Sequence, residues 1–365
     1  MATINLLYII TFFSVLFIAR FVFSRYYSVA KKYNLVKGYS NRSVHKGKVY
    51  TGAGLVLSFI LLLLAVGLNI VDFLFFEKLS PIIGASILVA IIGFYDDFRE
   101  ISAFQKSAVL AFLIVTTILV GTDTSLDYGI ITNLNGFFGI NEIEYIPGLI
   151  FTCLVYLSIM NAINLIDGID GYIGIFSLIF FFWFFLMYHN DAFFTHSIIS
   201  IIFMASMLVF LKHNFSRKEK LFVGDAGSLF LGFWMANFLI LFITSADGVS
   251  FTNLFSIKLE NIPVLAIATL NIPVLDTLRV MLVRLLNGKS MFLADRNHIH
   301  HILIDRGINH LGTSLILCLI NAFNLLVIFF LEPYFNSIEL TGVYIGVSLT
   351  WFGIFEYIKR KKHSI

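Results

Sequence analysis

Acidic and amide side chains recur at a fixed spacing near the middle of the chain. Asn164, Asp167 and Asp170 follow one another every three residues, and Gly168 and Gly171 interrupt the helical pattern around them. Such spacing around a break gathers oxygen ligands near one point. Oxygen-only ligands suit a hard cation such as Mg²⁺, which keeps waters and shares the phosphates of a substrate. The pattern therefore predicts a site for a magnesium-bound phosphate, although the glycines could also serve only to end a helix.

Two further acidic positions stand at the ends of apolar runs. Asp96 and Asp97 are neighbours, so on a helix their side chains point about 100° apart and must have different roles if they are functional. A solvated helix end is the alternative. Gly224-Asp225-Ala226-Gly227-Ser228 opens a later run and places a carboxylate among the free N–H groups of a helix N terminus. It predicts a seat for an anion or a metal phosphate, with an ordinary N-cap as the alternative.

A histidine-rich segment, Asp295-Arg296-Asn297-His298-Ile299-His300-His301, lies in the last third of the chain. Three histidines invite a zinc interpretation, but no cysteine accompanies them and the arginine favours the binding of an anion. Asp276 and Arg279, three residues apart on a predicted helix, are either an intrahelical pair or part of the same site.

The composition places these clusters in a membrane protein. Of 365 residues, 59% are hydrophobic and 13% are charged, whereas soluble domains are about 25% charged. A formal net charge of +3 is a weak argument for nucleic acid, and no nucleic-acid partner is expected. Cys153 and Cys318 lie inside apolar runs and predict neither a disulfide framework nor a metal site.

Runs of about 20 apolar residues predict an all-α polytopic bundle of about eleven transmembrane helices in a single domain, 1–365. Alternating polarity in 128–145 is compatible with an exterior β-hairpin. The predicted spans are 3–23, 52–71, 79–95, 107–121, 146–165, 171–188, 193–211, 227–245, 262–284, 313–331 and 340–358.

The distribution of Lys and Arg predicts the orientation. Residues 25–48 are rich in both, so this segment is expected in the cytoplasm, with the N terminus outside and the C terminus cytoplasmic. Alternation then places the loop 122–145, which has acidic residues but no Lys or Arg, on the outer face. All the polar clusters fall on the cytoplasmic side of this arrangement, which favours one active site at the inner face of the cell membrane.

Taken together in chain order, these motifs resemble those of the polyprenyl-phosphate N-acetylhexosamine-1-phosphate transferases, over about residues 40 to 310. The His-Ile-His-His form is similar to the branch that initiates O-antigen, enterobacterial common antigen and teichoic-acid linkers. This sequence departs from the family where Thr51-Gly52-Ala53-Gly54 replaces a glycine pair and where Ala294 replaces a frequent proline. The matching motifs are Asp96-Asp97, Asn161-x-x-Asn164-x-x-Asp167-Gly-Ile-Asp170-Gly171, Phe222-Val-Gly224-Asp225-Ala-Gly227-Ser228 and Asp295-Arg296-x-His298-Ile-His300-His301.

The resemblance implies a role for each matching residue. Asp225 would hold Mg²⁺, or Mn²⁺, on a pyrophosphate, with Asn164 as a second ligand. Asp96 would orient or deprotonate the lipid phosphate, and orientation is favoured because a phosphate monoester with a second pKa near 6 is already mostly dianionic. The other catalytic candidates, which would shape the metal and nucleotide site, are Asp97, Asp167 and Asp170, and the substrate-binding candidates are Lys46, Asn161, Arg296, His298, His300 and His301.

The implied reaction transfers a sugar 1-phosphate from a UDP-N-acetyl sugar to polyprenyl (undecaprenyl) phosphate, with release of UMP. The expected partners are these two substrates and the lipid bilayer, and a homodimer is a candidate assembly. One alternative is the peptidoglycan phospho-N-acetylmuramoyl-pentapeptide transferase. A lipid-linked substrate transporter or flippase is the alternative from another class; transporters place ionisable residues near the bilayer midplane, whereas the clusters here stand at its inner edge.

Overall fold

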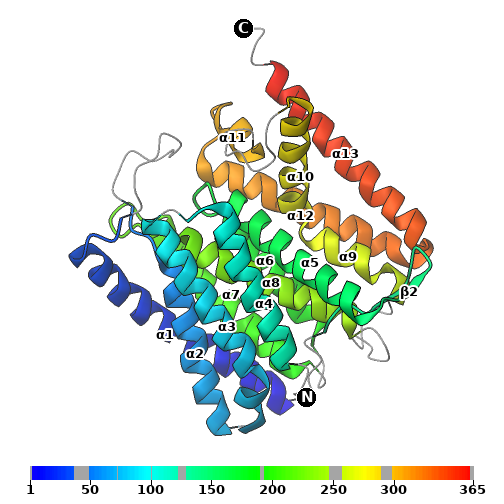
Figure 1. The fold of residues 1–365 in the computed structure, drawn as a ribbon. Helices are drawn as coiled ribbons and strands as arrows, with labels where there is room; N and C mark the ends of the chain where they lie inside the picture. Colours follow the sequence, from blue (N-terminus) through cyan, green and yellow to red (C-terminus); the bar gives the residue numbers. More distant parts are fainter. Residues whose placement is uncertain are drawn as a thin grey trace.

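The computed structural model describes residues 2–36, 49–71, 73–99, 101–121, 129–189, 193–245, 257–288 and 298–361. These ranges fold into a helical bundle with one small two-stranded sheet (Figure 1). The helices are α1 (Ala2–Lys32), α2 (Ala53–Val71), α3 (Phe73–Phe98), α4 (Ala103–Gly121), α5 (Tyr145–Ile166), α6 (Tyr172–Met187), α7 (Phe194–Asn214), α8 (Gly224–Thr244), α9 (Ile262–Thr269), α10 (Asn271–Leu286), α11 (Ile299–Ile304), α12 (His310–Leu331) and α13 (Ser337–Lys361), with 3-10 turns η1 (Leu259–Asn261) and η2 (Glu332–Tyr334).

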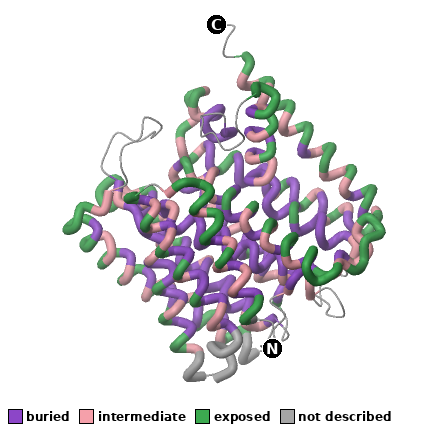
Figure 2. Tube along the Cα trace, in the orientation of Figure 1, coloured by how far each residue is buried: buried purple, intermediate pink, exposed green. Residues whose placement is uncertain are grey.

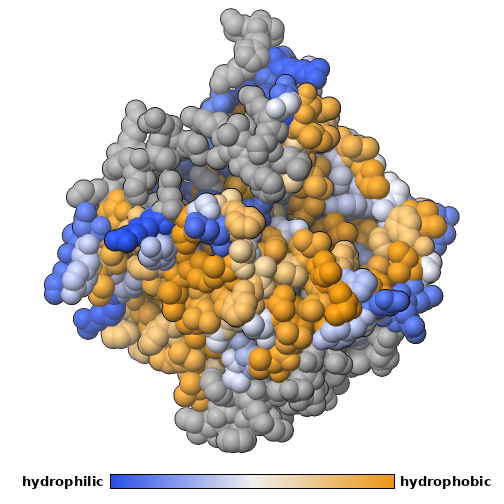
Figure 3. All heavy atoms as spheres, viewed as in Figure 1, coloured by the Kyte–Doolittle hydropathy of each residue, from blue (hydrophilic) through white to orange (hydrophobic). Residues whose placement is uncertain are grey.

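The predicted all-α membrane architecture is confirmed in its broad form. Among the described residues, eight helices are long and apolar enough to cross a membrane, and a bent pair raises the number to nine. Ala53–Leu68 and Tyr172–Met187 are shorter apolar helices at two further predicted spans. Figure 3 shows the matching surface, in which hydrophobic residues form a broad belt across the face in view. Large side chains such as Phe17, Phe104 and Phe112 are exposed, as expected of a surface that faces lipid.

The ninth predicted span, 262–284, is a bent pair of helices. Together α9 and α10 are long and apolar enough for one span, and they meet at an angle of 72°. Pro273 has no N–H and so leaves the carbonyl of Thr269 without its helical partner. The side chain of Asn321 in α12 provides hydrogen bonds to the backbone groups at the break. Its Nδ2 donates to Thr269 O and its Oδ1 accepts from Ile272 N, both at 2.9 Å. The bend is therefore built into the packing of α10 against α12.

Helix α8 forms the centre of the bundle. It packs against α2, α3, α5 and α9, and nearly all of its residues are buried. Figure 2 shows that buried residues are concentrated in the interior of the bundle. Its neighbours approach closely through glycines. A Cβ at Gly93 in α3 would lie 2.6 Å from the carbonyl carbon of Asp225, and one at Gly232 in α8 would lie 2.8 Å from the Cα of Met160 in α5. These contacts fix the start of α8 relative to α3 and α5.

The hairpin predicted in 128–145 is present. Strands β1 (Asn133–Phe137) and β2 (Ile140–Glu142) pair antiparallel, with Phe137 opposite Ile140. Asn135, Phe138 and the glycines of the turn have positive φ, as a tight reversal requires. Asn135 Nδ2 donates to the carbonyl of Ile243, which ties the hairpin to the C-terminal end of α8. The hairpin therefore lies at the end of the bundle opposite the start of α8.

Candidate active site

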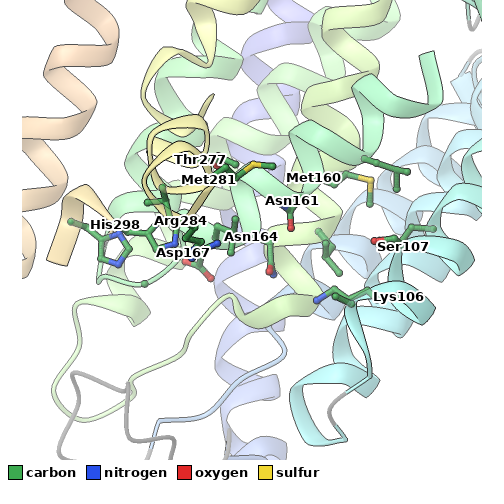
Figure 4. A pocket seen from close by; sticks show the side chains of 18 of the residues that line it. Lys106, Ser107, Met160, Asn161, Asn164, Asp167, Thr277, Met281, Arg284 and His298 are labelled. Carbon is green, nitrogen blue, oxygen red and sulfur yellow. The ribbon is translucent and has the colours of Figure 1, made fainter. Parts of the chain in front are cut away.

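A cavity of about 410 Å³ opens between α4, α5, α10 and α11. Figure 4 shows Lys106 and Ser107 entering it from one side and Arg284 and His298 from the other, with Asn161 and Asn164 between them. One part of the wall is polar and the rest is apolar. The polar lining is Lys106, Ser107, Asn161, Asn164, Asp167, Thr277, Arg284, His298, His300 and His301, and the apolar lining includes Leu110, Leu157, Met160, Leu165, Leu229, Val280 and Met281.

The C-terminal turns of α5 supply three of the predicted residues. Asn161, Asn164 and Asp167 all line the cavity, as their spacing of three residues on a helix allows. Asn164 Nδ2 donates to Ser228 Oγ at 2.8 Å, which links α5 to the first turn of α8. Because that contact uses the amide nitrogen, the amide oxygen remains as the ligand that Asn164 can offer to a cation.

Asp170, the last member of the series, lies elsewhere. It is absent from the cavity lining, and its carboxylate contacts Lys220 at 2.6 Å. His310 Nδ1 lies 3.6 Å from the same oxygen, and Ser314 Oγ donates to the Asp170 carbonyl. The regular spacing ends with α5, and Gly171, with a φ of 82°, turns the chain into α6. The structure thus separates Asp170 from Asn164 and Asp167 and places it in a link between the α5–α6 turn, the α7–α8 segment and α12.

Lys106 connects the two acidic clusters. Its ammonium group lies 2.6 Å from Asp96 Oδ2 and 2.8 Å from Asp225 Oδ2, and Lys106 also lines the cavity. The second oxygen of Asp96 accepts the backbone N–H of Ile101 at 2.8 Å. Lys106 was not among the site residues predicted from the motifs. Its position near the end of an apolar span is no specific signal, because lysines there commonly extend their ammonium group to the membrane interface.

Asp97 has a different environment, as its position beside Asp96 predicted. Its carboxylate is buried, accepts from Thr51 Oγ1 at 2.9 Å and accepts the backbone N–H of Asp225 at 3.1 Å. The Cβ of any other residue at Gly224, whose φ is 67°, would collide with Thr51 and Asp97. The anion at the N terminus of α8 is thus a carboxylate of the protein itself, and Asp97 orients the turn that carries Asp225.

The histidines cover the cavity on the side of α10 and α11. His298 and His300 stack with ring centroids 5.7 Å apart, and His300 and His301 lie 4.2 Å apart. Burial lowers the pKa of His300 to about 3, so its imidazole is neutral near pH 7. A Cβ at Gly168 would lie 2.5 Å from His300 Nε2, so this glycine lets the histidine pack against the α5–α6 turn.

The zinc interpretation gains no support in this part of the chain. No group of three or more His, Cys, Asp or Glu side chains within the described ranges could hold a metal ion. Lys46, Arg296 and Asp295 fall outside the residues that the structure describes.

The arrangement suits a ligand that is anionic at one end and apolar at the other. Cationic or hydrogen-bonding side chains from α4, α5, α10 and α11 converge at the polar part, where they can bind phosphate oxygens. The apolar wall, formed by α4, α5, α8 and α10, can cover a hydrocarbon chain.

Comparison with known proteins finds relatives of one kind. Residues 79–243 match the model of glycosyl transferase family 4. A probable undecaprenyl-phosphate N-acetylglucosaminyl 1-phosphate transferase of Bacillus subtilis is 30% identical over 246 residues, which are 67% of this chain and 63% of the relative. A decaprenyl-phosphate N-acetylglucosaminephosphotransferase of Mycobacterium leprae is 26% identical over 68% of this chain and 63% of the relative.

A third relative is the undecaprenyl-phosphate alpha-N-acetylglucosaminyl 1-phosphate transferase of Haemophilus influenzae, 29% identical over 63% of this chain and 62% of the relative. The chain thus matches a little under two thirds of the length of each of these three proteins. The matched region contains α3, α5 and α8, which carry Asp96, Asn164 and Asp225. The resemblance predicted from the motifs is confirmed, because residues 79–243 match the glycosyl transferase family 4 model and the three relatives carry transferase names of this kind.

Proposed function

We propose that the protein transfers N-acetylhexosamine 1-phosphate from a UDP-sugar to a polyprenyl phosphate. The observation that carries the proposal is the cavity, in which residues of separate motifs meet beside an apolar wall. In the reaction, an oxygen of the lipid phosphate forms a bond to the β-phosphorus of the UDP-sugar. The bond from that phosphorus to the bridging oxygen breaks, and UMP leaves with the electron pair. One phosphoanhydride replaces another, so catalysis consists of positioning and charge neutralisation.

Mg²⁺ fits the residues at the start of α8. Two carboxylates, Asp96 and Asp225, already share one cation, the ammonium of Lys106. At phosphate sites Mg²⁺ uses one or two carboxylates and completes its shell with water and substrate oxygens. We assign Asp225 and the amide oxygen of Asn164 as its protein ligands. The bound ion would supply positive charge to the pyrophosphate during transfer.

Lys106 and Asp96 would act on the acceptor. Lys106 lines the cavity, where its ammonium group would bind a phosphate oxygen of the acceptor, and a cation held by Asp225 would replace Lys106 as the partner of that carboxylate. Asp96 contacts Lys106 and accepts the Ile101 N–H, and it would orient the Lys106 ammonium group toward the acceptor phosphate. A phosphate monoester with a second pKa near 6 is mostly dianionic at neutral pH and needs no strong base.

The remaining polar wall would bind the donor. His298 and Arg284 lie opposite Lys106 across the cavity (Figure 4), and His300 and His301, whose rings neighbour one another and His298, line the same cavity. These side chains offer hydrogen bonds to the diphosphate and sugar. The apolar wall between α5 and α10 would hold the first isoprene units of the acceptor. The proposal includes eleven spans, with the N terminus outside, the C terminus in the cytoplasm and the cavity open to the cytoplasmic side of the cell membrane.

The test uses the full chain, purified in lipid nanodiscs. Undecaprenyl phosphate, Mg²⁺ and a panel of UDP-N-acetyl sugars are supplied, and both UMP release and the lipid product are measured. We expect stoichiometric UMP and lipid-linked sugar with at least one UDP-N-acetylhexosamine. Turnover only with UDP-N-acetylmuramoyl-pentapeptide would identify the peptidoglycan enzyme instead. Movement of a lipid-linked sugar between leaflets, without UMP release, would identify a flippase.

A further inference from the structure

Asp276 is a buried carboxylate behind the histidine wall of the cavity. It lies in α10, is 1% exposed and is absent from the cavity lining. Its Oδ2 lies 2.9 Å from Nδ1 of His298, and its Oδ1 accepts the backbone N–H of Ile299 at 2.9 Å. One carboxylate thus holds both the ring of a cavity residue and the first backbone N–H of α11. It fixes the start of the His-Ile-His-His segment to α10.

An ion pair with Arg279 also holds Asp276. Arg279, also 1% exposed, contacts Asp276 Oδ1 at 3.3 Å and Glu356 Oε1 at 2.7 Å. Glu356 lies in α13, so the series of charges runs from the last helix of the bundle to the cavity wall. A buried charge without a partner is strongly destabilising, and this series leaves each of the three with an opposite charge.

This geometry determines which nitrogen of His298 carries a proton. An ionised carboxylate can only accept hydrogen bonds, so the nitrogen that faces Asp276 must be Nδ1–H. The proton is thereby fixed on the buried side of the ring. Nε2 is then the nitrogen that remains to exchange a proton and to contact a ligand, and His298 lines the cavity.

We propose that Asp276 is a positioning residue for the donor substrate, because it fixes the tautomer and ring orientation of His298. Arg279 and Glu356 hold the Asp276 carboxylate in place. The inference rests on the proposed function, in which His298 contacts the diphosphate of the nucleotide sugar. Loss of the carboxylate changes which nitrogen His298 presents to the cavity, whereas Lys106, which would act on the acceptor, lies on the other side of the cavity. The effect should therefore fall on the donor and spare the acceptor.

The first experiment separates the two substrates. Asp276→Asn preserves volume but offers an amide that can itself donate to Nδ1 and so favour the wrong tautomer. We expect the KM for the UDP-sugar to rise by about tenfold, the effect of losing one hydrogen bond to a charged group, while the KM for polyprenyl phosphate changes by less than about twofold. Equal losses for both substrates, or no loss in a folded variant, would overturn the proposal.

A peripheral variant tests the same series of charges with less risk to folding. Glu356→Gln removes the charge on α13 that pairs with Arg279, and it should raise the same KM by a smaller factor. Glu339→Gln is the matched control, because Glu339 lies in the same helix and its carboxylate accepts from Asn336 N in an exposed position. Identical donor KM values in the two variants would contradict a role for α13.

A spectroscopic measurement does not depend on turnover. In protein labelled with ¹⁵N-histidine, the His298 ring is assigned by its loss in His298→Gln. Its neutral form should carry the proton on Nδ1 and none on Nε2, and Asp276→Asn should shift the population toward Nε2–H. An unchanged tautomer would refute the inference even in an active enzyme. If the tautomer shifts but no UDP-sugar is turned over by the unmodified protein, the proposed function fails while the role of Asp276 stands.

Discussion

Adding one methyl group to α3 should inactivate the site without touching a polar residue. In Gly93→Ala, the new Cβ would lie 2.4 Å from the Asp225 carbonyl oxygen and 2.6 Å from its carbonyl carbon, whereas ordinary contact begins at 3.4 Å. Both opposing atoms are backbone, so α3 and α8 must separate by about 1 Å. Overpacking of this kind costs about 1–3 kcal/mol of folding free energy. A misplacement of about 1 Å can reduce a rate a hundredfold, and Asp225 lies in the displaced turn.

The matched control is on the same helix. A Cβ at Gly84 in α3 meets nothing within 4 Å, so Gly84→Ala should keep the wild-type rate and gain up to about 1 kcal/mol from helix propensity. The assay combines thermal unfolding in detergent with UMP release at saturating substrates. Gly93→Ala should lose at least about tenfold in kcat while it still unfolds cooperatively. Equal rates for the two variants would show that the start of α8 does not position the reacting groups.

Four other outcomes follow from the described geometry. Asp225→Asn should abolish most activity without changing thermal unfolding, and EDTA should stop UMP release until Mg²⁺ or Mn²⁺ is restored; full turnover in chelator would contradict the metal assignment. Asp96→Asn should reduce the rate equally at all pH values above about 7, because the lipid phosphate is already dianionic there; recovery at about pH 8–9 would identify a general base instead. The pKa of His300 is about 3 in the folded protein and about 6.5 in the unfolded chain, so the protein should lose stability as the pH falls below about 6.5. His300→Gln should lose less, and thermal midpoints measured at about pH 7.5 and 5 would reveal the difference. A reporter fused after α13 should be cytoplasmic and one inserted at Asn135 should be outside; both on one side would refute the eleven-span proposal.

The positions of the helices could be predicted because each apolar run is a local signal. The break between α9 and α10 could have been predicted too, since Pro273 lies within the run and a proline usually ends or bends a helix just before its own position. What the sequence does not reveal is how the break is stabilised. That depends on Asn321, which lies about 50 residues away along the chain and reaches Thr269 only through the packing of α12.

The candidate site shows the same division between local and long-range information. Asn161, Asn164 and Asp167 were predictable because one helix carries them and helical periodicity brings them to one wall. The roles of Asp97 and Asp170 were not predictable, because each depends on a partner from a distant helix or loop. Asp97 accepts the Asp225 N–H, and Asp170 contacts Lys220. Such pairings follow from tertiary packing, and no local pattern in the sequence indicates them.

The central burial of α8 also sets the order in which the protein can be built. A chain is synthesised from its N terminus, so α3, α4 and α5 enter the membrane before residues 224–244 leave the ribosome. At that stage Asp97 has no helix to cap, and Lys106 has Asp96 as a partner but not yet Asp225. Insertion of α8 fills the space between the earlier helices and completes these pairs together. A nascent chain arrested before α8 should therefore be a substrate for membrane quality control, and one arrested just after it should not.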